Sequence, residues 1–213
     1  MPVLPYVIDL ILWVLGIFSV LTWTILLVKM VMFMRMKLAN RRFMALFDKV
    51  SNAAELKNSV QDTYGPFSDL ASAYLSEMRM FAHDTMLDVQ SRGEMLRHTL
   101  SQERRGIQTR LEGGLAALAS IGSISTILGL LGTVWSIMNL LKALSGAGTA
   151  GLDLVAGPIG DALITTAVGI IVAVPALLGH NFFARRVRVA LIDMERFNER
   201  LQHLAIRSGF KAE

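Results

Sequence analysis

The chain lacks cysteine altogether, which excludes disulfide bonds and thiolate metal sites from its 213 residues. Only four histidines occur, and they are too dispersed to form a zinc-binding HExxH pattern: His83, His98, His180 and His203. The phosphate-binding GxxxxGK(S/T) loop and the GxSxG nucleophile elbow are both missing. Hydrolase, zinc and nucleotide chemistry therefore have no basis in the sequence, and we expect neither an enzyme activity nor a cofactor.

Charge is nearly absent from three long stretches. Hydrophobic residues make up 53% of the sequence and the mean hydropathy is +0.49, which is too apolar for a soluble domain. A membrane-spanning helix needs about 20 mainly apolar residues, because each residue rises about 1.5 Å across a hydrocarbon core of about 30 Å. Runs of that length occupy residues 10–28, 113–141 and 155–183. The sequence thus predicts an all-α integral membrane protein with three transmembrane helices.

Basic residues collect at the ends of these runs. Lys and Arg favour cytoplasmic loops, and with three spans only Lys142 among the 21 basic residues would lie at the outer surface. We therefore expect the N-terminus outside and the C-terminus in the cytoplasm. The basic residues follow the first run, whereas those of a cleaved signal peptide precede it, so we expect this span to be retained. Their clustering at membrane boundaries favours membrane lipids, and not nucleic acid, as partners.

The runs divide the chain into six expected segments, in which the second and third spans extend into a cytoplasmic helical bundle. Apolar residues recur at helical intervals before the second span and after the third, so we expect both helices to continue straight across the membrane boundary. The segments are 1–34 (outer end and first transmembrane helix), 35–112 (cytoplasmic helical region), 113–143 (second transmembrane helix), 144–154 (short outer loop), 155–183 (third transmembrane helix) and 184–213 (cytoplasmic C-terminal helix).

Three local signals modify this helical pattern. Gly113 and Gly114 stand where the second span begins, and they either bend the helix there or allow close packing. The stretch "SNAAELK", which starts at Ser51, resembles a helix start without the strict spacing of a capping box. Pro175 removes a backbone donor in the middle of the third span and predicts a kink.

Asp161 is the one acidic residue within the third span. An ionised side chain within a span costs about 2.5 to 3.5 kcal/mol on insertion scales, so such a group usually faces protein or water. One interpretation is therefore the entrance of a water-filled pore. The alternative is an interfacial carboxylate at a helix N-terminus, where the helix dipole favours negative charge. The sequence leaves both interpretations open.

Small and hydroxyl-bearing residues form a stripe on each of the last two spans. Such stripes either let helices pack closely or line a polar passage, and a threonine hydroxyl can also simply bond to a carbonyl of its own helix. The stripes are Gly122, Thr126, Gly129, Thr133 and Ser136 on the second span, and Ala162, Thr166, Gly169, Ala173 and Ala176 on the third, flanked by Asp161 and Thr165. The expected packing positions are Gly129, Gly132 and Gly169, and the expected lining positions are Thr126, Thr133, Asp161, Thr165 and Thr166.

Three motifs carry a resemblance to a known family. They are "LTWTILLVK" in the first span, "GLLGTVWSIMN" in the second and "GPIGDALITTAVGIIVAVPALLGHNFFAR" in the third. Together they resemble the ExbB/TolQ branch of the MotA/TolQ/ExbB proton-channel family, and ExbB most. The resemblance implies a homopentamer in the bacterial inner membrane whose second and third spans ring a central pore. An ExbD-like or TolR-like subunit would occupy that pore, and proton flow would power a TonB-like or TolA-like protein.

The resemblance also implies roles for particular residues. Thr133 matches the threonine of the family's "GTVW" motif, Thr166 matches a second pore-facing threonine, and Asp161 matches the family's pore glutamate. Three positions depart from the pattern: Asp161 has a shorter side chain than the glutamate, Thr126 replaces a proline and Ser136 replaces a glycine. The expected function is a proton-channel subunit that energises TonB-dependent outer-membrane transport. The alternatives are a TolQ-type subunit of the Tol-Pal system and a passive scaffold for partner helices, while three spans argue against a four-span flagellar stator.

Overall fold

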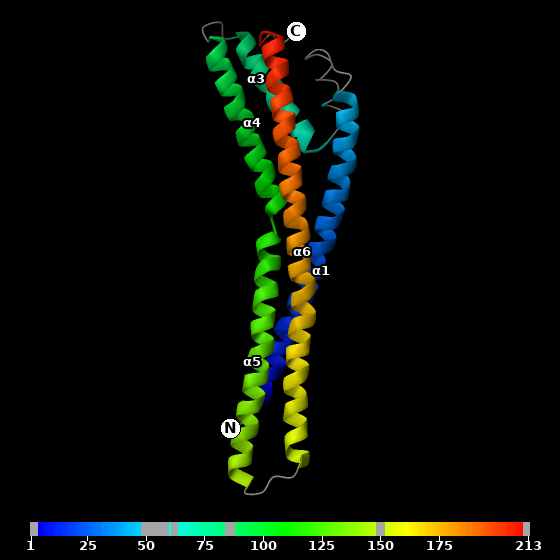
Figure 1. Ribbon diagram of the computed structural model, residues 1–213, viewed down its shortest axis with the longest axis vertical. Helices are drawn as coiled ribbons and strands as arrows, with labels where there is room; N and C mark the ends of the chain where they lie inside the picture. Colours follow the sequence, from blue (N-terminus) through cyan, green and yellow to red (C-terminus); the bar gives the residue numbers. More distant parts are fainter. Residues whose placement is uncertain (1–3, 48–59, 61–63, 84–87, 148–151, 211–213) are drawn as a thin grey trace. The chain divides into compact units, whose positions relative to one another are not determined.

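The computed structural model describes residues 4–47, 60, 64–83, 88–147 and 152–210. Within these ranges the chain forms five long α-helices and no strand (Figure 1). They are α1 (Leu4–Phe47), α3 (Pro66–His83), α4 (Val89–Glu112), α5 (Leu115–Ala147) and α6 (Leu152–Arg207). The helix start expected at "SNAAELK" and residues 148–151 of the expected outer loop lie outside the described residues.

Three helical segments are long and apolar enough to cross a membrane. Among the described residues they are Tyr6–Phe47, Val89–Ser145 and Val155–Arg207, with mean hydropathies of 2.4, 1.9 and 2.3 in their most apolar windows. Each contains one of the apolar runs read from the sequence. The prediction of an all-α membrane protein with three membrane-spanning helices is therefore confirmed.

The chain folds into two compact units, and α1 and α6 contribute residues to both. The first unit comprises Met1–Lys29 and Gly114–Ala184, and the second comprises Met30–Gly113 and Arg185–Glu213. The first unit contains the apolar runs, whereas the second contains α3, α4 and most of the charged residues.

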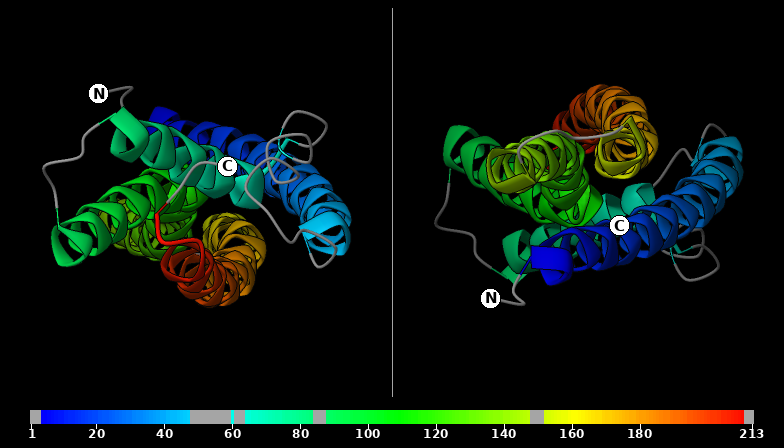
Figure 2. Two further views of the ribbon diagram at one scale, coloured as in Figure 1. Left: turned by 90° about the horizontal axis from the view of Figure 1, so that it is seen from above. Right: turned by 90° about the horizontal axis from the view of Figure 1, so that it is seen from below.

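In the first unit α5 and α6 run side by side, and α1 packs along one side of this pair (Figure 2). Ile11 and Leu15 of α1 share a buried cluster with Ile121 of α5 and with Val172 and Ala176 of α6. Many large apolar side chains of this unit are exposed, for example those at positions 13, 20 and 171. Such a surface suits contact with lipid or with other membrane helices.

The second unit is a helical bundle with an aromatic core. The Phe197 ring lies 5.8 Å from that of Phe43, 5.0 Å from that of Phe47 and 5.0 Å from that of Phe67, measured between centroids. Residues from α1, α3 and α6 thus meet around one side chain, and all four rings are buried. Buried aromatic pairs add about 0.5 to 1.5 kcal/mol beyond their burial, so this cluster stabilises the packing of α1, α3 and α6 in the unit.

Polar contacts join α3 and α4 as an antiparallel pair. The Thr99 hydroxyl donates to Glu77 Oε2 at 3.1 Å, and Arg110 Nη2 lies 3.3 Å from Asp69 Oδ2. The Glu77 side chain is buried, so the hydrogen bond from Thr99 offsets part of the free energy lost when its carboxylate leaves water. Asp88 caps the start of α4, because its side chain accepts a hydrogen bond from the Ser91 amide at 3.0 Å.

Tyr74 on α3 gives this unit a dependence on alkaline pH. Its side chain is fully buried, and burial raises the pKa of Tyr74 to about 12 from an ordinary value of 10.0. The folded state favours the neutral phenol of Tyr74. The contribution of this side chain to the free energy of unfolding is therefore complete below about pH 10 and is lost as the pH rises through about 12. We expect Tyr74→Phe to flatten the fall in melting temperature over this range. Tyr64→Phe, at a 91% exposed position, is the control, and equal slopes for both variants would contradict the assignment.

The prediction that the second span continues straight from its preceding helix is wrong. The helix α4 ends at Glu112 and α5 begins at Leu115, with Gly113 and Gly114 between them. Gly114 has a φ of +78°, a left-handed conformation that glycine adopts without strain. The Gly113 amide still donates to the Thr109 carbonyl, so the turn closes the end of α4. In contrast α6 is uninterrupted at Pro175, and the predicted kink there stays a prediction.

Candidate functional site

The helices α5 and α6 approach each other most closely at two glycines. A Cβ atom added to Gly169 would lie 2.7 Å from the Ser125 carbonyl oxygen and 2.9 Å from the Gly129 Cα. A Cβ atom added to Gly129 would lie 3.2 Å from the Thr166 Cα. Real Cβ atoms do not tolerate backbone contacts as short as those at Gly169, so the two backbones touch here only because both residues lack a side chain.

Thr165 lies inside this helix contact. Its side chain is fully buried, its hydroxyl donates to the Asp161 carbonyl at 2.8 Å, and its methyl group fills the space beside Gly132. A hydroxyl held in this way has no open surface in the subunit, so the burial does not support the expected lining role of Thr165. Ser125 and Ser136 of α5 are also buried, and Ser125 is absent from the stripe read from the sequence.

The buried stripes are thus rotated slightly from the expected ones. On α5 the buried positions include Ser125 and Gly132, whereas Thr126 and Thr133 are half-buried beside them. On α6 Thr165 is buried and Thr166 is half-buried. The spacings i, i+4, i+7 and i, i+3, i+7 both suit one face of a helix, so sequence periodicity cannot choose between two neighbouring stripes.

The half-buried threonines make different hydrogen bonds. Thr126 donates to the Gly122 carbonyl at 3.2 Å and Thr133 donates to the Leu130 carbonyl at 2.7 Å, both within α5. Thr166 instead donates across to α5, to the Gly129 carbonyl at 3.0 Å. The own-helix bond allowed by the sequence is therefore found at Thr126 and Thr133, while Thr166 ties the two helices together at their closest point.

Thr126, Thr133 and Thr166 share one side of the α5–α6 pair, the side away from α1. The helix α1 packs near Ile121 and Val168. At about 100° per residue, Thr126 lies about 140° around α5 from Ile121, and Thr166 lies about 160° around α6 from Val168. Since Thr133 is two turns beyond Thr126, it extends the same edge. We call these three residues the threonine edge.

Asp161 is exposed but does not join the threonine edge. It stands two turns before Val168 on α6 and therefore on the side of that helix where α1 packs. The structure thus brings Thr126, Thr133 and Thr166 together and places Asp161 elsewhere on α6. No group of three His, Cys, Asp or Glu side chains that could hold a metal ion occurs within the described ranges.

Comparison with known proteins assigns the chain to a family. The family model described as "MotA/TolQ/ExbB proton channel family" matches residues 67–196, which include α5, the threonine edge and Asp161. The chain belongs to this family. As a MotA/TolQ/ExbB protein it is a member of a proton-channel family and not of an enzyme family.

Named relatives place the chain in the ExbB-like branch of the MotA/TolQ/ExbB family. It is 31% identical over 183 residues to the "Biopolymer transport protein ExbB" of Neisseria meningitidis, covering 83% of this chain and 82% of the relative. The protein of the same name from Xanthomonas campestris pv. campestris is 32% identical over 161 residues. That match covers 71% of this chain and 62% of the Xanthomonas protein, so the chain spans less than two thirds of that relative.

Proposed function

We propose that the chain is the ExbB-type subunit of an inner-membrane motor that uses the proton motive force to energise TonB-dependent outer-membrane transport. The observation that carries this proposal is the threonine edge, an array of hydroxyls on the side of α5 and α6 away from α1. Hydroxyls can donate and accept hydrogen bonds, so they suit the lining of a hydrated path for protons. Membership of a proton-channel family supports the same role.

The surface of the first unit supports an oligomer. Asp161 is exposed on a membrane-spanning helix, and a carboxylate facing acyl chains costs about 2.5 to 3.5 kcal/mol on insertion scales. A ring of copies would take the threonine edge away from lipid, and contacts between neighbouring copies would cover Asp161. We propose a homopentamer that encloses the membrane helices of an ExbD-like subunit and works with a TonB-like protein, while a TolR-like and TolA-like pair is the alternative.

The distribution of basic residues supports an orientation. Lys and Arg favour the cytoplasmic ends of spans, and the second unit contains nearly all of them. We propose that the second unit lies in the cytoplasm with the C-terminus and that the N-terminus lies in the periplasm. Asp161 then stands towards the periplasmic end of α6, where protons would enter.

Reconstitution with the partner tests the proposed function. The chain would be co-expressed with a small ExbD-like protein, and liposomes holding both would be given a membrane potential. We expect acidification of the liposomes, followed with an internal pH dye, to exceed that of liposomes holding the chain alone. A stable complex that passes no protons would favour the passive scaffold.

Asp161 should contribute electrostatically to that flux. A carboxylate at the proton entrance attracts cations and hydronium, so we expect Asp161→Asn to assemble normally and to reduce proton flux about tenfold. Asp161→Glu keeps the charge and is the matched control, which should retain most of the flux. Full flux in Asp161→Asn would show that Asp161 is only an interfacial carboxylate at a helix end, without a part in proton transport.

A further inference from the structure

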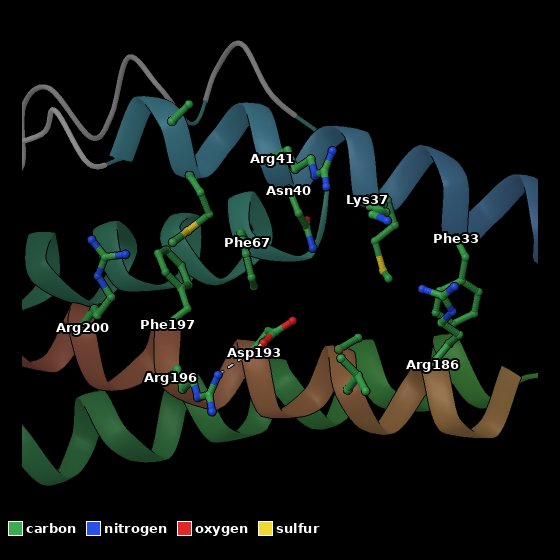
Figure 3. Close-up of a pocket in the computed structure, with 15 residues that line it drawn as sticks. Phe33, Lys37, Asn40, Arg41, Phe67, Arg186, Asp193, Arg196, Phe197 and Arg200 are labelled. Carbon is green, nitrogen blue, oxygen red and sulfur yellow. Dashed lines mark ion pairs between the residues drawn. The ribbon is translucent and has the colours of Figure 1, made fainter. Parts of the chain in front are cut away.

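The second unit contains a pocket of about 790 Å³ that the proposed proton path does not use. It lies between the second half of α1, the start of α3 and the last part of α6 (Figure 3). All of its lining residues belong to the second unit. The volume falls within the range of about 300 to 1,000 Å³ that is usual for small-molecule sites.

The charge around this pocket is strongly one-sided. Five cationic side chains line it against a single carboxylate: Lys37, Arg41, Arg186, Arg196 and Arg200 against Asp193. The Asp193 carboxylate is 3.9 Å from Arg196 Nη1, an exposed ion pair of small energetic weight. Arg200 stacks over the Phe47 ring at 4.7 Å, which fixes its guanidinium beside the pocket. The arrangement suits an anion with several oxygen acceptors, such as a phosphate group.

The rest of the lining is apolar, which narrows the class of anion. Phe33, Phe67 and Phe197 contribute ring surface between the basic groups (Figure 3). Val189 adds methyl groups to the lining. Inorganic phosphate would satisfy the cations and leave this surface uncovered. An amphiphile, with a phosphate group on a glycerol and acyl chains, would cover both.

The sequence positions of the lining residues point to the membrane surface. Arg186 stands three residues beyond Phe183, where the uncharged run of the third span ends, and Phe33 stands two residues before Arg35, the first charged residue after Lys29. Three helical residues span about 4.5 Å, which lies within the headgroup layer of about 5 to 8 Å on each side of the hydrocarbon core. The end of the pocket marked by Phe33 and Arg186 therefore stands at the level of lipid phosphates.

We propose that this pocket binds the phosphate headgroup of an anionic phospholipid. Lys37 and Arg41 from α1 and Arg196 from α6 would contact the phosphate oxygens, and the aromatic side chains would cover the glycerol and the first methylenes. A bound lipid would thereby link α1 to α6 within the second unit. The proposal does not depend on proton transport.

Native mass spectrometry of the full chain, released from detergent, would test the site. The chain would be titrated with phosphatidylglycerol, with zwitterionic phosphatidylcholine and with inorganic phosphate as a competitor. The pocket variant is Lys37→Gln/Arg41→Gln/Arg196→Gln. The matched control, Arg35→Gln/Arg42→Gln/Arg188→Gln, removes three basic residues of the same segments that do not line the pocket.

We expect phosphatidylglycerol to bind the pocket variant about a hundredfold more weakly than the native chain, and the control less than about threefold more weakly. Val189→Trp keeps every charge and fills the pocket, so it should also lose the lipid. This variant tests the site even if the triple variant does not fold. Equal losses in the two triple variants would reduce the effect to general surface charge and overturn the proposal. Displacement of the lipid by millimolar phosphate would make free phosphate the ligand and would overturn the lipid assignment.

Discussion

Gly169→Val is expected to abolish proton flux in the reconstituted complex. The new side chain would meet the Ser125 carbonyl and the Gly129 Cα, neither of which can rotate away as a side chain would. Overpacking of this kind costs about 3 kcal/mol at the upper end of the usual range, and α5 and α6 would have to separate to relieve it. Separation would also break the bond from Thr166 to Gly129 and move the threonine edge.

Two glycine variants control for this effect. Gly157→Ala lies on the same helix, and its Cβ would meet nothing within 4 Å, so we expect native flux. Gly122→Ala would meet only the side chain of Leu177, which can change rotamer, so we expect an intermediate effect. Flux and melting temperature would be measured together for each purified complex. Native flux in Gly169→Val would show that close contact between α5 and α6 is not needed for transport.

The double variant Thr133→Val/Thr166→Val is expected to reduce proton flux by about a hundredfold. Valine has nearly the volume of threonine, so the change removes two hydroxyls, including the one that donates to the Gly129 carbonyl, without opening a cavity. Each hydroxyl that stabilises a passing charge is worth about 1.5 to 3 kcal/mol, or about tenfold or more in rate. Flux would be measured at constant protein amount, with assembly checked by size-exclusion chromatography.

Thr24→Val is the matched control for the loss of a hydroxyl. Thr24 on α1 donates to the Val20 carbonyl at 2.8 Å and is exposed, so it loses a similar hydrogen bond outside the α5–α6 pair. We expect its flux to stay within about twofold of the native value. Single variants would separate the two threonines, because Thr166 also ties α5 to α6 whereas Thr133 bonds only within α5. An unchanged flux in the double variant would leave the threonine edge without a role in conduction.

The spans were predictable because hydropathy and length are properties of the sequence alone. The pairing of α5 with α6 was partly predictable, since small residues at helical spacing mark a close contact. The choice between Thr165 and Thr166 as the buried residue was not, because it depends on the rotation of each helix against its neighbour. The position of Asp161 away from the threonine edge also follows from where α1 packs, which no local pattern encodes.

The second unit was less visible in the sequence. Its core brings Phe197 together with Phe43 and Phe67, which lie more than a hundred positions earlier in the chain and share no motif with it. The break at Gly113 and Gly114 was open to two interpretations, and the φ of +78° at Gly114 decides for a turn. The basic pocket likewise depends on residues of α1 and α6 that only the fold brings together.

Cysteine accessibility is the most direct measurement of whether the threonine edge lines a hydrated conduit. The chain has no native cysteine, so each introduced thiol is the only one. Thr126→Cys and Thr133→Cys would be compared with Ile171→Cys and Val20→Cys, which replace exposed side chains elsewhere on the first unit. In the membrane-embedded assembly we expect a water-soluble methanethiosulfonate reagent to modify the first pair and to spare the second. Modification of Ile171→Cys and Val20→Cys alone, or of all four at equal rates, would contradict the conduit.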